Sequence, residues 1–278
     1  MIIDCHVHTN LEAESKEELL KQLDAAGIQR MVLLSNRPAS FFKEGGTGPI
    51  LGGQSINAAT ALAQVMDWAA FSDRIIPFFW IDPLEEDAFD QVDKAVTAGI
   101  AGFKVISNRH FPGDDKPMQV WEHIAKNNKP ILFHSGILYG NGPWSQYNRP
   151  VGFEALLDIP NLRFAMAHVS WPWCDECLAV YGYWQSRKNR GTSSAELFID
   201  TTPGTPKIYR NEVFYKIYHI GYDIEDNLIF GTDCNSIYNS DYTKQILSMD
   251  NEALNKAEVR AEQKEKYFSK NIIRFLNG

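Results

Sequence analysis

Cysteine is scarce in this sequence, and its four copies are scattered at Cys5, Cys174, Cys177 and Cys234. Four cysteines are too few for disulfide bonds to hold together a chain of 278 residues, which excludes a disulfide scaffold and favours reduced cysteines. Cys174 and Cys177 form a Cys-x-x-Cys pair, but a second pair, which a structural zinc site would need, is missing. We therefore interpret all four as ordinary thiols.

Long apolar runs and basic clusters are also missing. No segment approaches the roughly 18 apolar residues of a membrane span, and the first residues, with Asp4 and two histidines, lack the apolar core of a signal peptide. The formal net charge is −8, and no basic run is longer than "SRKNR" around Arg187. We therefore expect a cytoplasmic protein that binds a small molecule and neither nucleic acid nor membranes.

A hydrophobic fraction of 44% with 22% charged residues is typical of a folded protein. Runs rich in β-branched and aromatic residues predict eight strands, over residues 1–8, 30–36, 74–82, 99–107, 130–136, 163–170, 196–202 and 228–234. Amphipathic stretches between them predict helices over 15–27, 57–72, 86–99 and 118–128. Apolar strands that alternate with helices are typical of a parallel sheet buried on both faces, and eight such units predict a (β/α)8 TIM barrel.

No linker-like segment divides the chain, so we expect residues 1–278 to form a single domain, with a C-terminal helical tail over 257–277 on its outside. Two long segments, 36–55 and 136–152, are rich in Gly, Pro and aromatic residues and follow the second and fifth strands. In a barrel, such loops cover the C-terminal face, where lids and substrate contacts are found. The sequence leaves the oligomeric state open, a homo-oligomer included.

Residues with metal-ligand chemistry mark the C-terminal ends of several strands. They are, in chain order, His6, His8, Lys104, His134, His168 and Asp233. A lone histidine on a strand is more often a core residue than a ligand, but a barrel brings its strand ends to one mouth. His110, His123 and His219 fall instead in a loop or on helices, as expected of surface histidines. The pattern therefore predicts a metal site at the mouth.

Five motifs, "DCHVH", "FHSG", "AHVS", "GTDC" and "YFSKNIIRFL", occur in order along the whole chain. Together they resemble the amidohydrolase superfamily, in particular the branch with the aminocarboxymuconate-semialdehyde decarboxylase-like enzymes. The resemblance implies a divalent metal, usually zinc, held by His6, His8, His134 and Asp233. It implies that His168 is either a further ligand or a hydrogen-bond donor that polarises the substrate.

The resemblance does not decide whether the site holds one metal ion or two, and the answer depends on the role of Lys104. In binuclear members of the superfamily a lysine of the fourth strand is carboxylated and bridges two ions, and Lys104 in "GFKVIS" has a matching place. Alternatively, Lys104 is unmodified and pairs with a carboxylate of the protein or of the substrate. The other motifs are more similar to the mononuclear branch.

This set of residues predicts a reaction as well as a site. Zinc lowers the pKa of a bound water from 15.7 to about 7. Asp233 is the best candidate to accept the water's proton, and His168 or the metal would polarise a carbonyl group. We therefore expect hydrolysis of a small amide, lactone or ester. Decarboxylation of a small carboxylic acid at the same site is the alternative, and a non-catalytic or metal-free barrel is a third interpretation.

Candidate substrate contacts lie in the segments that follow the strands. Arg37 and Arg109 can each grip a carboxylate, although a solvated surface arginine is an equally good interpretation of either. Trp144 and Trp171 can wall an aromatic or sugar-like substrate, or else cap the barrel or lie in an oligomer contact. Asp82, in "WIDP", is expected to form a turn after the third strand.

Overall fold

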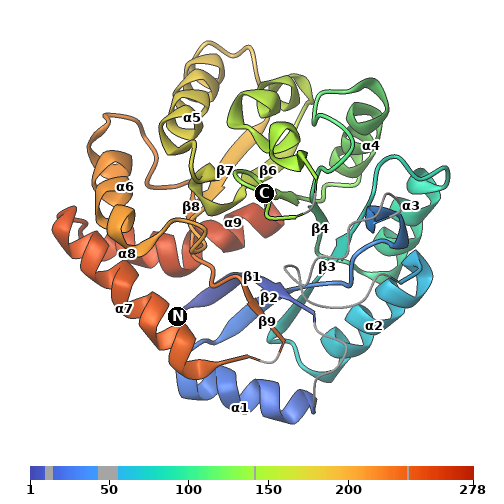
Figure 1. Cartoon of the computed structure of the whole chain (residues 1–278), viewed down its shortest axis with the longest axis horizontal. Coiled ribbons are helices and arrows are strands. Elements are labelled where there is room, and N and C mark those ends of the chain that lie inside the picture. Colours follow the sequence, from blue (N-terminus) through green and yellow to red (C-terminus); the bar gives the residue numbers. More distant parts are fainter. Residues whose placement is uncertain (10–14, 43–55, 141, 237) are drawn as a thin grey trace.

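The computed structural model describes residues 1–9, 15–42, 56–140, 142–236 and 238–278. All strand pairs among them are parallel, in the order β8-β7-β6-β5-β4-β3-β2-β1-β9. The strands are β1 (Ile3–His8), β2 (Arg30–Leu34), β3 (Ile75–Trp80), β4 (Gly102–Val105), β5 (Ile131–Phe133), β6 (Arg163–Met166), β7 (Glu196–Asp200), β8 (Leu228–Ile229) and β9 (Cys234–Asn235). The sheet curls around a central axis inside a ring of helices, which confirms the predicted TIM-barrel fold (Figure 1).

The eighth predicted strand, 228–234, is divided into the two short strands β8 and β9, which pair with β7 and β1. Between them, the backbone N–H of Cys5 donates to the carbonyl of Phe230 at 2.9 Å, and that of Asp233 donates to the carbonyl of His6 at 3.0 Å. These bonds close the barrel. The strand is interrupted at Asp233, whose φ of 57° lies in the left-handed region.

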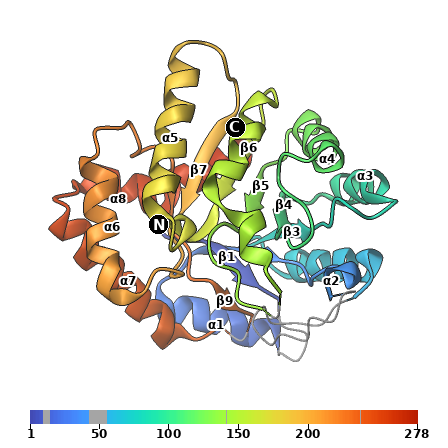
Figure 2. The same ribbon diagram turned by 45° about the horizontal axis from the view of Figure 1, so that its top comes forward.

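Helices follow most of the strands and pack against the outside of the barrel (Figures 1 and 2). They are α1 (Lys16–Ala26), α2 (Ala58–Phe71), α3 (Ala88–Ala98), α4 (Asp115–Lys126), α5 (Cys174–Asn189), α6 (Lys207–His219), α7 (Ser240–Lys256), α8 (Ala261–Glu265) and α9 (Asn271–Asn277). The side chains of Ser15 and Asn57 cap α1 and α2, and left-handed Gly27 and Gly99 end α1 and α3. The four helices predicted from amphipathic stretches are therefore present.

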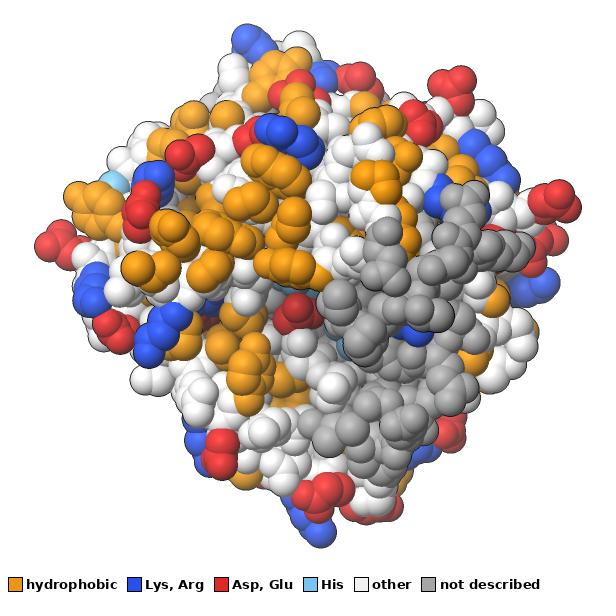
Figure 3. Space-filling view, in the orientation of Figure 1, with side chains coloured by type: hydrophobic (Ala, Val, Ile, Leu, Met, Phe, Trp, Pro, Cys, Tyr) orange, Lys and Arg blue, Asp and Glu red, His pale blue; other side chains and the backbone are white. Residues whose placement is uncertain are grey.

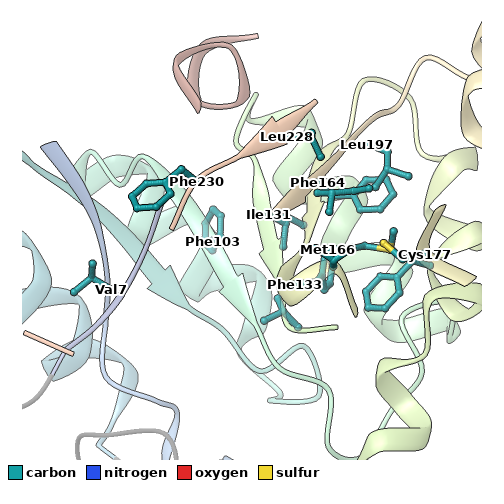
Figure 4. Close-up of a cluster of buried hydrophobic side chains, with 14 of the residues drawn as sticks. Val7, Phe103, Ile131, Phe133, Phe164, Met166, Cys177, Leu197, Leu228 and Phe230 are labelled. Carbon is teal, nitrogen blue, oxygen red and sulfur yellow. The ribbon is translucent and has the colours of Figure 1, made fainter. Parts of the chain in front are cut away.

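The main core lies between the strands and the surrounding helices, and Figure 4 shows part of it. Trp121 of α4 packs edge-to-face on Phe133 of β5 at a centroid distance of 5.2 Å, and Phe133 lies 6.3 Å from Phe164 of β6. Phe133 and Phe164 point outward from the barrel, so alternate residues of the same strands point into it.

A second cluster fills the barrel interior, and the C-terminal segment reaches it. The ring of Phe275 in α9 lies 5.1 Å from that of Phe198 and 6.5 Å from that of Phe78, and Phe275 and Ile272 are each 1% exposed. The predicted helical tail is therefore present, but its last helix closes the N-terminal end of the barrel instead of lying on the outside. The sequence shows the apolar face of such a helix and not the surface that it covers.

The loop after β2 was predicted to form a cover over the mouth, but its residues 43–55 lie outside the described part of the chain. The described part of this loop forms a short 3-10 helix, Ala39–Phe42, in which the ring of Phe41 lies 5.4 Å from that of Trp80. Among the described helices, none is long and apolar enough to cross a membrane.

Candidate metal centre

Three predicted ligands converge at the C-terminal end of the barrel. The Nε2 atoms of His6 and His8 lie 3.2 Å apart, and Oδ1 of Asp233 lies 3.4 Å from each of them. Two histidines at alternate positions of β1 share a face of the strand, as the sequence predicts. Ligands around a tetrahedral ion with bonds of about 2.0–2.1 Å are themselves about 3.3 Å apart. This donor set therefore fits a divalent metal ion.

A buried carboxylate that sequence reasoning missed holds the first histidine. Nδ1 of His6 donates to Oδ2 of Asp200 at 2.7 Å, and both side chains are fully buried. Because the proton sits on Nδ1, the lone pair of Nε2 is directed at the metal site. Asp200 is the last residue of β7, and this position at a strand end could have marked it as a site residue. The sequence does not show that its partner is His6.

The two remaining predicted histidines, His134 and His168, line a cavity of about 160 Å³ beside these ligands. Their ring centroids are 5.0 Å apart. Nε2 of His134 lies 3.2 Å from the carbonyl oxygen of Ile137, and Nδ1 of His168 lies 2.7 Å from the hydroxyl of Thr202. The structure thus brings His8, His134 and His168 to one cavity, with the ring of His6 5.4 Å from that of His168, and a ligand role for His134 and His168 stays a prediction.

An unusual backbone segment carries His168 into the cavity. His168, Val169 and Ser170 have φ values of 61°, 46° and 55°, and a left-handed conformation is rare for a β-branched residue such as Val169. The next residue, Trp171, passes so close to Gly136 that a Cβ atom there would lie 2.3 Å from its carbonyl oxygen. The surrounding chain therefore imposes this turn, as is common where side chains must be aimed at a site.

Burial sets the protonation states of the cluster. It lowers the pKa of His6 well below its ordinary value, with help from the charge of Lys104, and lowers that of His168 to about 4. Burial alone would raise the pKa of Asp233, but His6 and His8 hold it below its usual range. Neutral imidazoles beside an ionised carboxylate are the states in which these groups bind a metal.

Lys104 lies within the cluster, fully buried on β4. Its Nζ is 3.2 Å from Nε2 of His6, and burial lowers the pKa of its amine to about 8 against the opposing charges of Asp200 and Asp233. This position is compatible with both predicted roles, a carboxylated ligand and an ammonium group paired with protein carboxylates.

Of the predicted substrate contacts, the fold places some at the cavity and others away from it. Trp171 lines the cavity. Arg109 is not a lining residue of the cavity, and its guanidinium donates to Asp82, which also accepts a hydrogen bond from the backbone of Leu84 at 2.9 Å. The last contact is the turn that the sequence predicts for Asp82.

Two other predicted contacts lie near the loop after β2. Trp144 packs against Phe41 at a centroid distance of 6.0 Å and is not a lining residue of the cavity. Arg37, at the start of that loop, is partly buried, which lowers the pKa of its guanidinium. Their contacts with a substrate stay predictions.

The wall of the cavity beside the histidines is apolar. It is formed by Ile106, Ile137, Leu138, Tyr139 and Trp171. Figure 3 shows this face of the molecule, with acidic and histidine atoms at the centre and hydrophobic side chains beside them. Polar groups on one side and apolar groups on the other suit a small organic molecule with one polar reacting group.

Comparison with known proteins agrees with this geometry. The amidohydrolase family model matches residues 3–278, so the chain belongs to the amidohydrolase family. A search of curated proteins finds no match to the chain.

Solved structures share the fold at low sequence identity. A probable 2-pyrone-4,6-dicarboxylic acid hydrolase from Acinetobacter baumannii is 12% identical, with a TM-score of 0.64 over 100% of this chain and 99% of its own. Amidohydrolase 2 from Bifidobacterium longum subsp. infantis is 11% identical, with a TM-score of 0.59 over 99% and 98%. A dihydroorotase from Campylobacter jejuni is 14% identical, with a TM-score of 0.55 over 98% and 82%. Likeness at this level supports the fold and leaves the substrate open.

Proposed function

We propose that the protein is a metal-dependent hydrolase that acts on a small amide, lactone or ester through a metal-activated water. The observation that carries the proposal is the approach of Nε2 of His6, Nε2 of His8 and Oδ1 of Asp233 to within 3.2–3.4 Å of one another. These residues would hold a divalent ion, and their nitrogen-rich set favours zinc. Such an ion supplies a nucleophile, because it lowers the pKa of a coordinated water to about 7.

Two side chains of the protein would carry out the other steps: Asp233 transfers the protons and His168 binds the carbonyl group. Asp233 is ionised, and its side chain is 36% exposed toward the cavity, so it can accept a proton from the attacking water and return it to the leaving group. Nδ1 of His168 is engaged by Thr202, so Nε2 is the nitrogen left to bind a substrate carbonyl oxygen or to act as a further ligand.

Decarboxylation on the same residues is the alternative reaction. It requires a cation that binds the substrate's carboxylate, and the sequence offers Arg37 and Arg109 for this role. Asp82 engages Arg109, which weighs against Arg109 in this role, whereas Arg37 stays a candidate for it. Release of carbon dioxide from a small carboxylic acid, with no ¹⁸O from labelled water in the remaining organic product, would favour the alternative.

The first test is the metal content per chain, measured by elemental analysis on protein purified without chelator. We expect one or two equivalents in the wild type and a loss in His6→Ala/His8→Ala. His123→Ala is the matched control, because His123 lies on α4 and pairs with Asp93 at 2.6 Å, away from the cavity. Activity on a panel of esters, lactones and amides should disappear with chelator and return with zinc. Protein that binds no metal, even after incubation with zinc or manganese, would contradict the proposal.

A further inference from the structure

Aromatic side chains lie at the edge of the cavity, and we call Tyr139, Trp171 and Tyr209 the aromatic shelf. Tyr139 and Trp171 line the cavity, and the ring of Trp171 packs against that of Tyr209 at a centroid distance of 4.9 Å and an angle of 33°. Trp171 and Tyr209 also line a second groove, between the start of α5 and α6. The shelf therefore extends from the reacting groups to the outer surface of the barrel.

The backbone of Trp171 is held by hydrogen bonds, and the shelf is open to solvent. The backbone N–H of Trp171 donates to the carbonyl of His168 at 3.0 Å, and its own carbonyl accepts from Ile137 at 2.6 Å. Tyr139 is 59% exposed and Tyr209 is 44% exposed. Figure 3 shows hydrophobic side chains running outward from the centre of this face, on the side where Figure 1 places α5 and α6. Covering exposed apolar surface with a ligand contributes favourably to the free energy of binding.

The charged groups along the groove are engaged with one another. Lys216 pairs with Asp175 at 3.1 Å and with Glu212 at 3.0 Å, and the guanidinium of Arg149 pairs with Glu176. A ligand in this groove therefore meets aromatic faces and paired charges in which three carboxylates face two cations. This environment disfavours an anion and suits a neutral, planar group.

We propose that the aromatic shelf binds an apolar, planar arm of the substrate while its carbonyl group lies in the cavity. The substrate class is then a neutral ester, amide or lactone with an aromatic or extended apolar arm. The catalytic part of this statement rests on the proposed function. Continuity supports it, because Trp171 belongs to both the cavity and the groove, so an arm that leaves the cavity on this side must cross it.

The test uses two ketones that cannot be hydrolysed, acetophenone and 2-acetylnaphthalene, which differ by one ring. Binding is measured by calorimetry on the full-length protein, with and without zinc. We expect the naphthyl ketone to bind about fivefold more tightly, which corresponds to partial burial of the second ring. Tyr209→Ala should remove most of this preference. Tyr215→Ala is the matched control, because Tyr215 lies on the same helix, is 54% exposed and stacks on His219 away from the cavity.

Equal affinity for the two ketones in the wild type, or an unchanged preference in Tyr209→Ala, would overturn the proposal. So would a dimer in sedimentation velocity that Ile208→Asp dissociates, because Ile208, which is 82% exposed beside Tyr209, would then lie in an interface between copies. Binding of the ketones needs no turnover. If esters are not hydrolysed and no metal is bound, but the preference for the naphthyl ketone persists and depends on Tyr209, the proposed function is wrong and the proposed role of the aromatic shelf in binding is retained.

Discussion

Oδ2 of Asp200 lies 2.7 Å from Nδ1 of His6, and the two residues are 194 positions apart in the sequence. The other oxygen of Asp200 accepts a hydrogen bond of 2.6 Å from the backbone N–H of Thr202. The carboxylate of Asp200 therefore accepts one hydrogen bond from the backbone and one from His6, whose other ring nitrogen faces the metal site. This arrangement makes the tautomer of His6 depend on a residue that does not itself face the metal.

Asp200→Asn tests that dependence. Because the N–H of Thr202 can only donate, the amide oxygen of the variant must face it, and the amide NH₂ must face Nδ1 of His6. The proton of His6 then moves to Nε2, where it blocks coordination. We expect zinc affinity, measured by competition with a chromogenic chelator, to fall about 10- to 100-fold. Asp93→Asn, which alters the surface pair with His123, should leave zinc affinity unchanged.

A second prediction concerns Gly204, which lies against His168. A Cβ atom at position 204 would lie 2.7 Å from Cβ and 2.9 Å from Cγ of His168, so Gly204→Ala must displace the imidazole. A misplacement of about 1 Å at a reacting group costs about 100-fold in rate, and we expect kcat/KM to fall by that order while zinc content is retained. Gly152→Ala is the control, because its nearest atom, in Pro112, lies 3.6 Å away. Equal activity of both variants would mean that the position of His168 does not matter.

The parts of the site that the sequence predicts are those fixed by barrel topology. Strand alternation places His6 and His8 on one face, and parallel strands in sequential order bring His134, His168 and Asp233 to the same mouth whatever the loops do. Family motifs and strand ends therefore predict the members of this cavity. They do not predict hydrogen bonds within it, because those depend on the register and tilt of strands that are distant in the chain.

The surroundings of two other residues were also not predictable from the sequence, because they depend on neighbours that are distant in the chain. Arg109, a candidate substrate contact, is engaged by Asp82, a carboxylate at the end of the neighbouring strand, and its contact with a substrate stays a prediction. His110 was expected at the surface, yet it is 3% exposed, with its ring 6.3 Å from that of Trp121. In each case a partner from a neighbouring strand or helix determines the environment, and a single sequence does not show which residues become neighbours.

The third prediction concerns a buried ion pair beneath α6 and α7. The guanidinium of Arg210 donates to the carboxylate of Asp250 and, at 2.9 Å, to the carbonyl of Thr201, and Tyr267 donates to the same carboxylate at 2.6 Å. Arg210→Met leaves Asp250 buried and unpaired, so we expect the free energy of unfolding in urea to fall by about 3–5 kcal/mol.

Two further variants separate this charge effect from a loss of packing. Arg210→Met/Asp250→Leu removes both charges and should recover most of the lost stability. Lys256→Met breaks the exposed pair with Glu252 and should change the free energy of unfolding by less than about 1 kcal/mol. If the double variant is as unstable as Arg210→Met, the loss comes from packing and hydrogen bonds instead of an unpaired charge.

The last prediction concerns pH and His110, which lies outside the metal centre. Burial lowers the pKa of His110 in the folded protein below its ordinary value of 6.5, so the unfolded chain binds a proton more readily. Stability contributed by the neutral ring is therefore present above pH 6.5 and is lost as the pH falls below it, by at most about 1.4 kcal/mol per pH unit. In His110→Gln, the decrease in unfolding free energy between pH 7.5 and 5.5 should be smaller than in the wild type. An unchanged decrease in His110→Gln would contradict the lowered pKa of His110 in the folded protein.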